Sequence, residues 1–186
     1  EARIQTGETV VVTGAGGGLG VHLIQLARNL GARVLAVTSS EGKVNFLSKL
    51  GAHEVIVNGE LDFSEVVLAL TNEKGAEVIM DTVGSPLFSS SLRSLAPYGR
   101  MVVVGEVSGS AVQLNLADLI FRDARLIGSV GTSKLHLEQA ARLVLEGKVQ
   151  PIVSHVLPWN QTMEAYKLLK TRESIGRVAL NFTTIS

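Results

Sequence analysis

The chain has 186 residues with 17 Lys and Arg and 17 Asp and Glu, and this formal net charge of 0 argues against a nucleic-acid partner, which needs clustered positive charge. It has no Cys, which excludes disulfides, thiolate metal sites and a cysteine nucleophile. Hydrophobic residues make up 46% of the chain, yet no apolar run approaches the roughly 18 residues of a membrane span, so we expect a cytoplasmic protein with no membrane partner.

Apolar blocks of strand length alternate along the chain with stretches of helical period. After the first block, Leu19, Leu23, Leu26 and Leu30 recur at the spacing of one helix face. Such alternation requires a parallel sheet covered by helices on both faces. With right-handed crossovers, the pattern predicts an α/β protein with the doubly wound, six-stranded parallel sheet of the Rossmann dinucleotide-binding fold. The expected strands are residues 10–13, 33–38, 54–57, 77–81, 100–105 and 126–130.

The pattern changes in the C-terminal part of the chain. A helix is expected over Gln161–Lys170, followed by a last strand over residues 177–180. We therefore expect residues 1–150 to form the dinucleotide-binding domain. Residues 151–186 would form a C-terminal helix–strand extension, which belongs either to another layer or to a catalytic domain missing from this chain. Because the chain begins with Glu1 and not with Met, we expect it to be a piece of a longer protein.

A glycine-rich loop joins the first expected strand to the first expected helix. Glycine permits a tight turn, lets the backbone approach a pyrophosphate and lets helix and strand pack closely, while the helix N-terminus offers unpaired N–H groups to phosphates. The nearest match to the G-x-G-x-x-G fingerprint is Ala15-x-Gly17-x-x-Gly20, in the required strand–loop–helix context. No Gly-Lys-Ser/Thr follows, which excludes a nucleoside-triphosphate loop; a tight turn without a ligand is the alternative. The expected cofactor-binding residues of this loop are Thr13, Gly14, Ala15, Gly16, Gly17, Gly18, Leu19 and Gly20.

The end of the second expected strand indicates which nicotinamide cofactor binds. NAD-binding domains carry an Asp or Glu there, on the adenosine ribose, whereas this chain has Thr38-Ser39-Ser40. Hydroxyl groups do not repel a 2′-phosphate as a carboxylate would, and Lys43, one helical turn further on, supplies a countercharge. Glu41 fits a first helical turn, where an acidic side chain complements the helix dipole. We therefore predict NADP(H) as the cofactor, with a solvent-facing Lys43 as the alternative.

Several short motifs follow one another in an order typical of one family. Together they resemble the cofactor domain of medium-chain dehydrogenases/reductases, in the branch of quinone reductases, enoyl reductases and zinc alcohol dehydrogenase-like proteins. The resemblance implies hydride transfer between NADPH and a quinone, enone, enoyl thioester or alcohol/carbonyl substrate. It also implies a catalytic domain that this chain lacks, and a homodimer that pairs through the sixth strand. Besides the glycine loop, the motifs are Val37–Lys43, Leu50–Ala52, Asp81–Gly84, Leu95–Arg100 and Glu146–Val149.

The same resemblance implies the remaining cofactor contacts. Ser39, Ser40 and Lys43 would meet the 2′-phosphate. Arg177 is similar to a basic residue that some members of the family use on the phosphates, whereas Asn58 stands where related quinone reductases carry a Tyr against the adenosine. The residues implied at the nicotinamide end are Thr82, Val83, Gly105, Glu106, Val107, Ser129, Val130 and Gly131.

No catalytic residue and no metal site are expected within the chain. Asp81 ends the fourth expected strand, where its expected role is to cap the following turn. In this interpretation the nicotinamide carries the chemistry and the protein positions it. The four His residues are scattered without the spacing of metal ligands: His22, His53, His136 and His155.

Two alternative functions are kept. A short-chain dehydrogenase would use Ser154 with the pair Tyr166 and Lys170, the Tyr being the general acid/base. In that family, however, the Tyr follows the fifth strand and an Asn-Asn-Ala-Gly element follows the fourth, and this chain shows neither. The other alternative is a non-catalytic NADP-binding regulatory or structural module, which an upstream substrate domain in the full gene would argue against.

Overall fold

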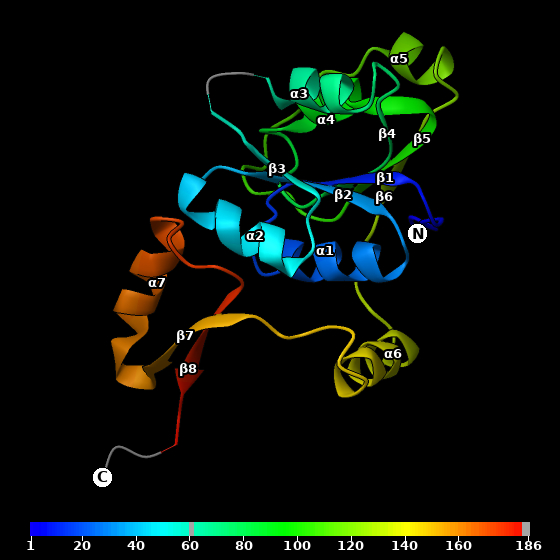
Figure 1. Cartoon of the computed structure of the whole chain (residues 1–186). Coiled ribbons are helices and arrows are strands. Elements are labelled where there is room, and N and C mark those ends of the chain that lie inside the picture. Colours follow the sequence, from blue (N-terminus) through cyan, green and yellow to red (C-terminus); the bar gives the residue numbers. More distant parts are fainter. Residues whose placement is uncertain (60–61, 184–186) are drawn as a thin grey trace.

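The computed structural model describes residues 1–59 and 62–183. Its main body is a six-stranded parallel sheet with the strand order β3-β2-β1-β4-β5-β6 (Figure 1). The order reverses between β1 and β4, which makes this place the topological switch point of a doubly wound fold. The predicted six-stranded Rossmann architecture is thereby confirmed. The strands are β1 (Thr9–Val12), β2 (Arg33–Thr38), β3 (Glu54–Val57), β4 (Ala76–Asp81), β5 (Leu95–Val103) and β6 (Arg125–Gly128).

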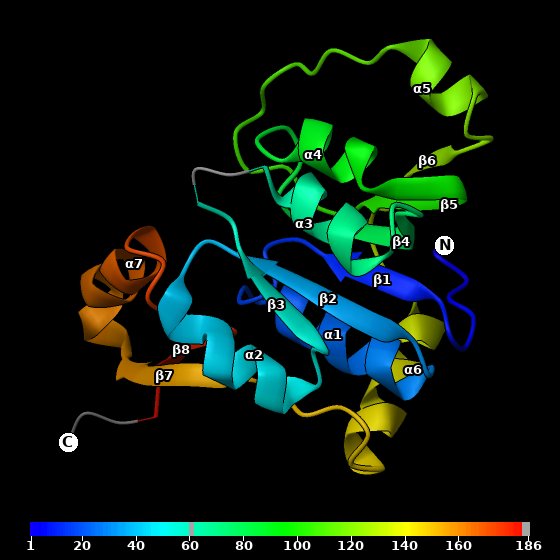
Figure 2. The ribbon, with the colours of Figure 1, turned by 45° about the horizontal axis from the view of Figure 1, so that its top comes forward.

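Helices cover both faces of this sheet (Figures 1 and 2). One face carries α1 (Gly20–Asn29) and α2 (Val44–Leu50), and the other carries α3 (Phe63–Leu70) and α4 (Phe88–Arg93). In β1, Val10 and Val12 lie in one apolar core with Ile24 of α1, while Val11 lies in the other core with Phe63 of α3. Because both faces of the sheet are buried, its strands are continuous apolar runs. Such runs can be recognised in the sequence.

The start of β5 differs most from its expected position. The strand begins at Leu95 and not at residue 100, although Pro97-Tyr98-Gly99 suggested a turn there. Leu95 pairs with Ala76 of β4, and the register then shifts between Ala76 and Val78. Such an irregularity accommodates a proline, which has no N–H for the ladder. The bounds of β1, β4 and β6 differ from the expected ones by one or two residues.

The C-terminal part of the chain contains a strand that the sequence did not predict. The remaining elements are α5 (Leu116–Ile120), α6 (Lys134–Leu145), β7 (Val153–Pro158), α7 (Thr162–Lys170), β8 (Arg177–Asn181) and the 3₁₀ turns η1 (Glu41–Lys43) and η2 (Trp159–Gln161). β7 and β8 pair in parallel as a two-stranded sheet, so the expected helix–strand extension is a strand–helix–strand unit. β7 has no buried side chain and hence no continuous apolar run to mark it.

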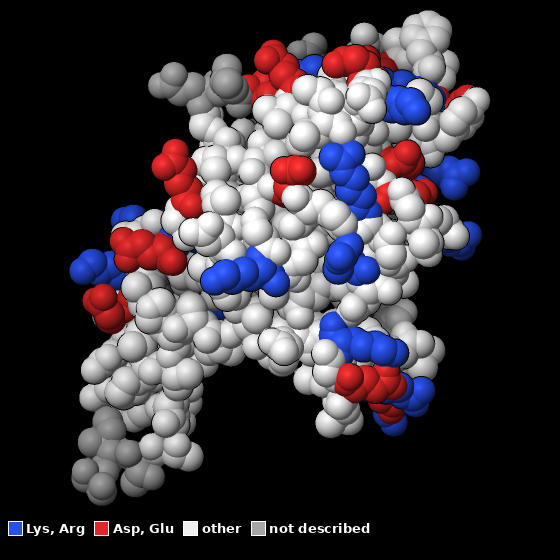
Figure 3. Space-filling view, in the orientation of Figure 1, with Lys and Arg blue, Asp and Glu red and all other residues white. Residues whose placement is uncertain are grey.

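Many large apolar side chains are exposed in the second half of the chain. Phe121, directly after α5, is 87% exposed, and Leu145, the last residue of α6, is 88% exposed. Charged side chains of both signs are interspersed over the face shown in Figure 3. Apolar exposure on this scale is typical of surfaces that pack against other protein. None of the helices in the described parts of the chain is long and apolar enough to cross a membrane.

Candidate nucleotide-binding site

Asp81 ties the carboxyl ends of β1 and β4 together at the switch point. Its Oδ1 accepts a hydrogen bond from the Thr13 hydroxyl at 2.7 Å and from the N–H groups of Val83 and Gly84 at 2.9 and 3.0 Å. Thr82 donates from its N–H to the Thr13 hydroxyl and from its own hydroxyl to the Thr13 carbonyl. The Asp81 side chain is fully buried. Its carboxylate therefore caps the following turn, as the sequence predicted.

The glycine loop turns sharply between β1 and α1. Gly14 has a φ of +57°, in the left-handed region that favours glycine. A Cβ at Gly20 would overlap the carbonyl oxygen of Gly14, because α1 begins directly against the loop. A Cβ at Gly17 would lie 3.2 Å from the same oxygen. The glycines thus permit the close packing of helix and strand that the dinucleotide fingerprint provides.

The loop presents a free N–H group at the start of α1. The Gly17 N–H donates to the Gly14 carbonyl and closes the turn. Within the described parts of the chain, the N–H group of Leu19 has no acceptor, whereas the N–H group of Gly18 faces the Gly176 carbonyl in the bridge between Gly17 and Gly176. Such groups at a helix N-terminus, together with the helix dipole, are a ready binding site for phosphate.

Two basic side chains lie against this loop, and a third, Arg172, lies near one of them. The stem of Lys43 crosses Gly16, where an added Cβ would lie 2.6 Å from Cδ and 3.3 Å from Nζ. The Arg177 guanidinium lies against Gly18 in the same way, with its Cζ 2.6 Å from an added Cβ. Burial, and then the nearby charge of Arg172, lower the pKa of Lys43. Among the residues the structure describes, no ion pair involves any of these cations, so their charge suits an anionic ligand.

Lys43 is buried in the structure, with only 8% of its surface exposed. Its Nζ donates a hydrogen bond of 2.8 Å to the carbonyl oxygen of Ser174. The alternative of a solvent-facing lysine is therefore wrong. Ser174 takes one of the three donors of the ammonium group, so two donors remain for a 2′-phosphate. The contact with a 2′-phosphate therefore stays a prediction.

The segment that leads into β8 lies along the glycine loop. Gly176 pairs with Gly17 in an isolated parallel bridge, and its N–H donates to the Gly16 carbonyl at 2.9 Å. The N–H of Arg177 donates to the carbonyl of Ile152 at 2.9 Å. These backbone contacts place the Arg177 side chain beside the loop. In the sequence, only the family resemblance indicated that position.

Glu106 joins the loops that follow β4 and β5. Its carboxylate accepts hydrogen bonds from the N–H groups of Ser85 and Ser108, at 2.7 and 2.8 Å, and from the Ser85 hydroxyl at 2.8 Å. These bonds lower the pKa of Glu106 to about 2. The side chain is therefore an ionised link between two loops at the expected nicotinamide end.

The structure brings most of the residues expected at the nicotinamide end to one edge of the sheet. The Val107 N–H donates to the Val83 carbonyl at 3.0 Å, so the loops after β4 and β5 lie side by side. The Ser129 N–H donates to the last residue of β5 at 3.0 Å. Val130 and Gly131 follow Ser129 beyond this edge, and the Val130 side chain is fully exposed.

The expected adenosine end of the site is lined by hydroxyl groups. Ser39 and Ser40 follow β2 directly; Ser39 is exposed, and the N–H of Ser40 bonds to the Thr38 hydroxyl at 3.3 Å. The N–H of Asn58 donates to the Thr38 carbonyl at 2.7 Å, which places Asn58 beside the end of β2. Glu41 begins η1, as expected for an acidic residue in a first turn.

Comparison with known proteins identifies the family. Residues 18–146 match the family described as zinc-binding dehydrogenase. The chain belongs to the zinc-binding dehydrogenase family. Acryloyl-coenzyme A reductase of Metallosphaera sedula is 38% identical over 180 residues, which cover 96% of this chain and 52% of that protein. The chain thus spans about half the length of this relative.

Solved structures of proteins similar to this zinc-binding dehydrogenase domain share its fold. An NAD-dependent alcohol dehydrogenase is 35% identical with a TM-score of 0.90, covering 97% of this chain and 52% of that one. A mycobacterial protein solved in complex with NADPH is 26% identical with a TM-score of 0.83, covering 96% and 58%. The resemblance to medium-chain dehydrogenases/reductases is confirmed, and the chain is a nucleotide-binding domain of that family. Since one of these structures is named for NAD and the other holds NADPH, the fold does not choose the cofactor.

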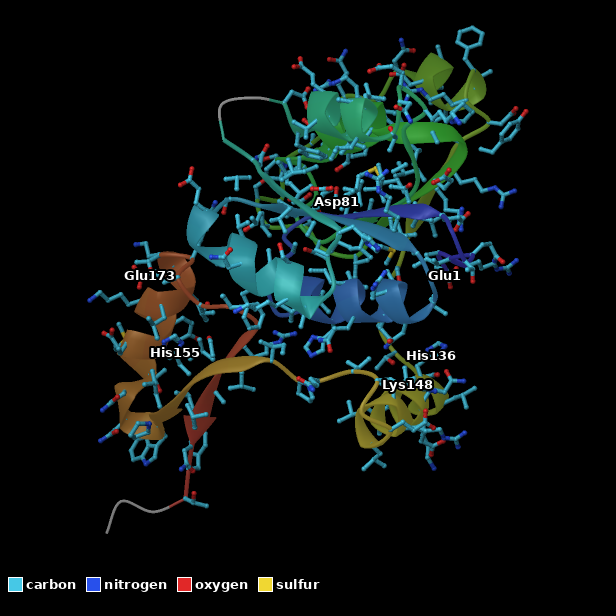
Figure 4. The ribbon with its side chains drawn as sticks, viewed as in Figure 1. Glu1, Asp81, His136, Lys148, His155 and Glu173 are labelled. Carbon is cyan, nitrogen blue, oxygen red and sulfur yellow. The ribbon has the colours of Figure 1, made fainter. Side chains whose placement is uncertain are left out.

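The histidines of this zinc-binding dehydrogenase domain are spread over separate parts of the fold. Figure 4 shows His136 near α6 and His155 near β7, well apart from each other and from Asp81. Within residues 1–59 and 62–183, no three His, Cys, Asp or Glu side chains are grouped so that they could hold a metal ion.

Family membership decides against the short-chain interpretation. Ser154 lies on β7 and its hydroxyl donates to the Arg177 carbonyl at 3.4 Å. Tyr166 lies on α7 with an exposed side chain, and Lys170 ends the same helix. In the described part of the chain no hydrogen bond joins these three side chains into a catalytic group. The short-chain interpretation is therefore wrong.

Sequence reasoning missed the contacts that tie the C-terminal segment to the site. Gln25 of α1 donates to the Gln150 carbonyl at 3.0 Å and accepts from the Gln150 N–H at 2.7 Å. Lys43 holds the Ser174 carbonyl, and Arg172 lies near Lys43. No local pattern marks such pairs, because backbone carbonyls and distant amide side chains have no signature of their own in a sequence.

Proposed function

We propose that this domain binds NADP(H) and serves an oxidoreductase that transfers a hydride between NADPH and its substrate. The observation that carries the proposal is the distribution of charge at the adenosine end. The end of β2 carries only hydroxyl side chains over Thr38–Ser40, and Lys43 is held beside the glycine loop. An acidic side chain at the end of β2 would favour NAD and repel a 2′-phosphate.

The groups around the loop fit the phosphates of a dinucleotide. The free N–H group of Leu19 would bind the pyrophosphate, and the Arg177 guanidinium beside Gly18 would add charge-assisted hydrogen bonds. The two serines after β2 and the Lys43 ammonium would bind the 2′-phosphate. Glycine at positions 16 and 18 leaves room for these cationic side chains against the backbone.

The nicotinamide ring supplies the hydride when the cofactor is bound. The residues of this chain would position the ring and supply no acid or base of their own. Asp81 holds the end of β4 and Glu106 ties the following loop to the loop after β5. A backbone held in this way keeps a binding surface in one geometry, which hydride transfer between two bound partners requires.

For the substrate we propose an activated carbon–carbon double bond, as in an enoyl thioester, an enone or a quinone. The names of relatives support this choice, since they include acryloyl-coenzyme A reductase and quinone oxidoreductase. An alcohol or carbonyl is the second choice, supported by the solved alcohol dehydrogenase. The substrate would be held by a part of the protein outside this chain, because the relatives are about twice as long.

A fluorescence titration with NADPH and NADH, side by side, tests the cofactor. We expect NADPH to bind at least about ten-fold more tightly, which is about 1.4 kcal/mol, because one ammonium group and two hydroxyl groups would contact its 2′-phosphate. Equal affinities, or tighter binding of NADH, would contradict the NADP preference. Failure of both nucleotides to bind would overturn the proposed nucleotide function.

The substitution Ser39→Asp tests the charge argument directly. Ser39 is exposed, so the fold should tolerate the change. We expect the Kd for NADPH to rise about ten-fold and the Kd for NADH to change less than about three-fold, because only NADPH carries the repelled phosphate. Ser39→Asn has the shape of the aspartate without its charge, so it should raise the Kd for NADPH much less than Ser39→Asp does and leave the Kd for NADH unchanged. An equal loss with Ser39→Asn would attribute the effect to shape and not to charge.

A further inference from the structure

Lys43 makes a contact that binding of a 2′-phosphate does not require. Its side chain leaves η1, crosses Gly16 and ends on the Ser174 carbonyl at 2.8 Å. A lysine that served only a phosphate at the adenosine ribose could stay extended into solvent, as exposed lysines do. Instead this ammonium is buried against a backbone carbonyl 131 residues away in the sequence.

The carbonyl that Lys43 holds belongs to the segment that carries Arg177. Two residues after Ser174, the Gly176 N–H bonds to the Gly16 carbonyl at 2.9 Å. Gly176 has a φ of +70°, and a Cβ there would overlap the Ile152 carbonyl oxygen, so the chain turns tightly at this point. The next residue places its guanidinium on Gly18. The Lys43 side chain therefore holds the start of the segment that places Arg177 beside the loop.

We propose that Lys43 is a positioning residue that holds Ser174 and thereby keeps Arg177 over the phosphate-binding loop. The proposal rests on the proposed nucleotide function, in which Arg177 meets the pyrophosphate. It gives Lys43 a role toward every dinucleotide, with or without a 2′-phosphate. The C-terminal strand–helix–strand unit is thus linked to the cofactor site by the hydrogen bond of Lys43 and by the backbone bridge at Gly17, beside the packing of Ile152 and Ile175 against the core.

The charges around Lys43 support this role. Arg172 lies in the same segment and repels the ammonium, yet the hydrogen bond to Ser174 keeps Lys43 in place. An anion bound at the loop would offset the repulsion between Lys43 and Arg172. We therefore expect a bound dinucleotide to strengthen the attachment of this segment, because binding and attachment favour the same arrangement.

Amide hydrogen exchange in the nucleotide-free chain tests the proposal without any cofactor. The N–H groups of Gly176 and Arg177 are both hydrogen-bonded and report on the segment. In Lys43→Met, which keeps an apolar stem and removes the ammonium, we expect both to exchange at least about ten-fold faster, while the N–H groups of β1 are unchanged. Lys49→Met removes an exposed lysine of the neighbouring helix α2 and should change neither rate. Unchanged exchange at Gly176 and Arg177 in Lys43→Met would overturn the proposal.

A second, conservative variant is needed if Lys43→Met destabilises the whole fold, so that the N–H groups of β1 exchange faster as well. Lys43→Arg keeps a charged donor, and we expect it to protect Gly176 and Arg177 as the wild type does. If these two groups exchange fast in Lys43→Arg while β1 is protected, a donor at this position does not hold the segment and the proposal fails.

The affinity for NADH separates positioning from recognition of the 2′-phosphate. NADH lacks that phosphate, so a lysine that only bound the phosphate would leave the Kd for NADH unchanged. We expect Lys43→Met to raise the Kd for NADH about five-fold or more, through the displaced Arg177, and to raise the Kd for NADPH further. An unchanged Kd for NADH would contradict the positioning role and leave the proposed function intact. If the wild-type chain binds neither nucleotide, the proposed function fails, while the exchange experiment still decides the role of Lys43.

Discussion

Thr13 and Asp81 lie 68 residues apart in the sequence, and their side chains form a buried hydrogen bond of 2.7 Å. The same carboxylate receives the N–H groups of Val83 and Gly84. At the scale of single residues, the shape of the nucleotide site depends on this group, because it holds the ends of the two central strands together. A donor left without its acceptor in such a buried place costs about 1–3 kcal/mol.

The substitution Asp81→Ala removes the acceptor of four donors at once, the fourth being the Ser91 hydroxyl. We expect the free energy of unfolding to fall by about 3 kcal/mol and the Tm by roughly 8 °C, measured by thermal denaturation. Asp81→Asn keeps one acceptor oxygen of the same shape and should lose only about 1 kcal/mol. Equal stability of Asp81→Ala and the wild type would show that the carboxylate does not hold the strand ends.

At the scale of elements, α3 shows how a helix start is stabilised beside the sheet. The Asp62 side chain accepts the Ser64 N–H at 3.0 Å as an N-cap, and it also pairs with Arg93 of α4. Partial burial raises the pKa of Asp62, but hydrogen bonds from Ser90, Ser64 and Arg93 outweigh it and lower the pKa to about 2. The ionised carboxylate therefore joins two helices on one face of the sheet.

This lowered pKa gives a pH dependence of known sign. A carboxyl group whose pKa is lower in the folded than in the unfolded protein stabilises the fold at pH values above its ordinary pKa, which is 3.8 for Asp62. This stabilisation disappears as the pH falls toward about 2. Asp62→Asn keeps the cap but does not ionise. Because the pair with Arg93 is partly exposed, we expect the wild type to melt only about 2 °C above Asp62→Asn at pH 7. Melting curves at decreasing pH should show this gap closing; a gap that persists at pH 2 would rule out the ionised pair as its cause.

At the scale of the whole molecule, the sheet ends on an open strand. β6 is the last strand in the sheet order, with β5 on one side only, and unpaired strand edges invite pairing with another chain. Leu126 on this strand is part of the exposed apolar surface of the second half of the chain. We propose that two copies of the chain pair along β6 as a homodimer.

The substitution Leu126→Lys tests this pairing, because a lysine on an edge strand discourages contact with another edge. We expect the wild type to sediment as a dimer and Leu126→Lys as a monomer in analytical ultracentrifugation. Leu145→Lys, at the exposed end of α6, is the matched control and should sediment as the wild type does. A monomeric wild type, or a dimeric Leu126→Lys, would contradict pairing through β6.

The sequence by itself determined the order of strands and helices up to α6, the fold class and the place of the glycine loop. Each depends on signals within a few residues: the apolar runs of strands buried on both faces, the helical period from Leu19 to Leu30, and the glycines between them. The role of Asp81 as a cap was also predictable, since it lies at the end of a strand and directly before the turn that it caps. The strand β7 was not, because none of its side chains is buried.

Only the tertiary structure decided what Lys43 contacts and how Arg177 reaches the loop. The sequence placed a positive charge after β2, but the partner of that charge is a backbone carbonyl 131 residues further on, which no side-chain pattern marks. The pairing of Gln25 with Gln150, over 125 residues, is of the same kind. Contacts of this sort depend on how one folded unit lies against another, and that arrangement results from packing over the whole molecule and not from local preference.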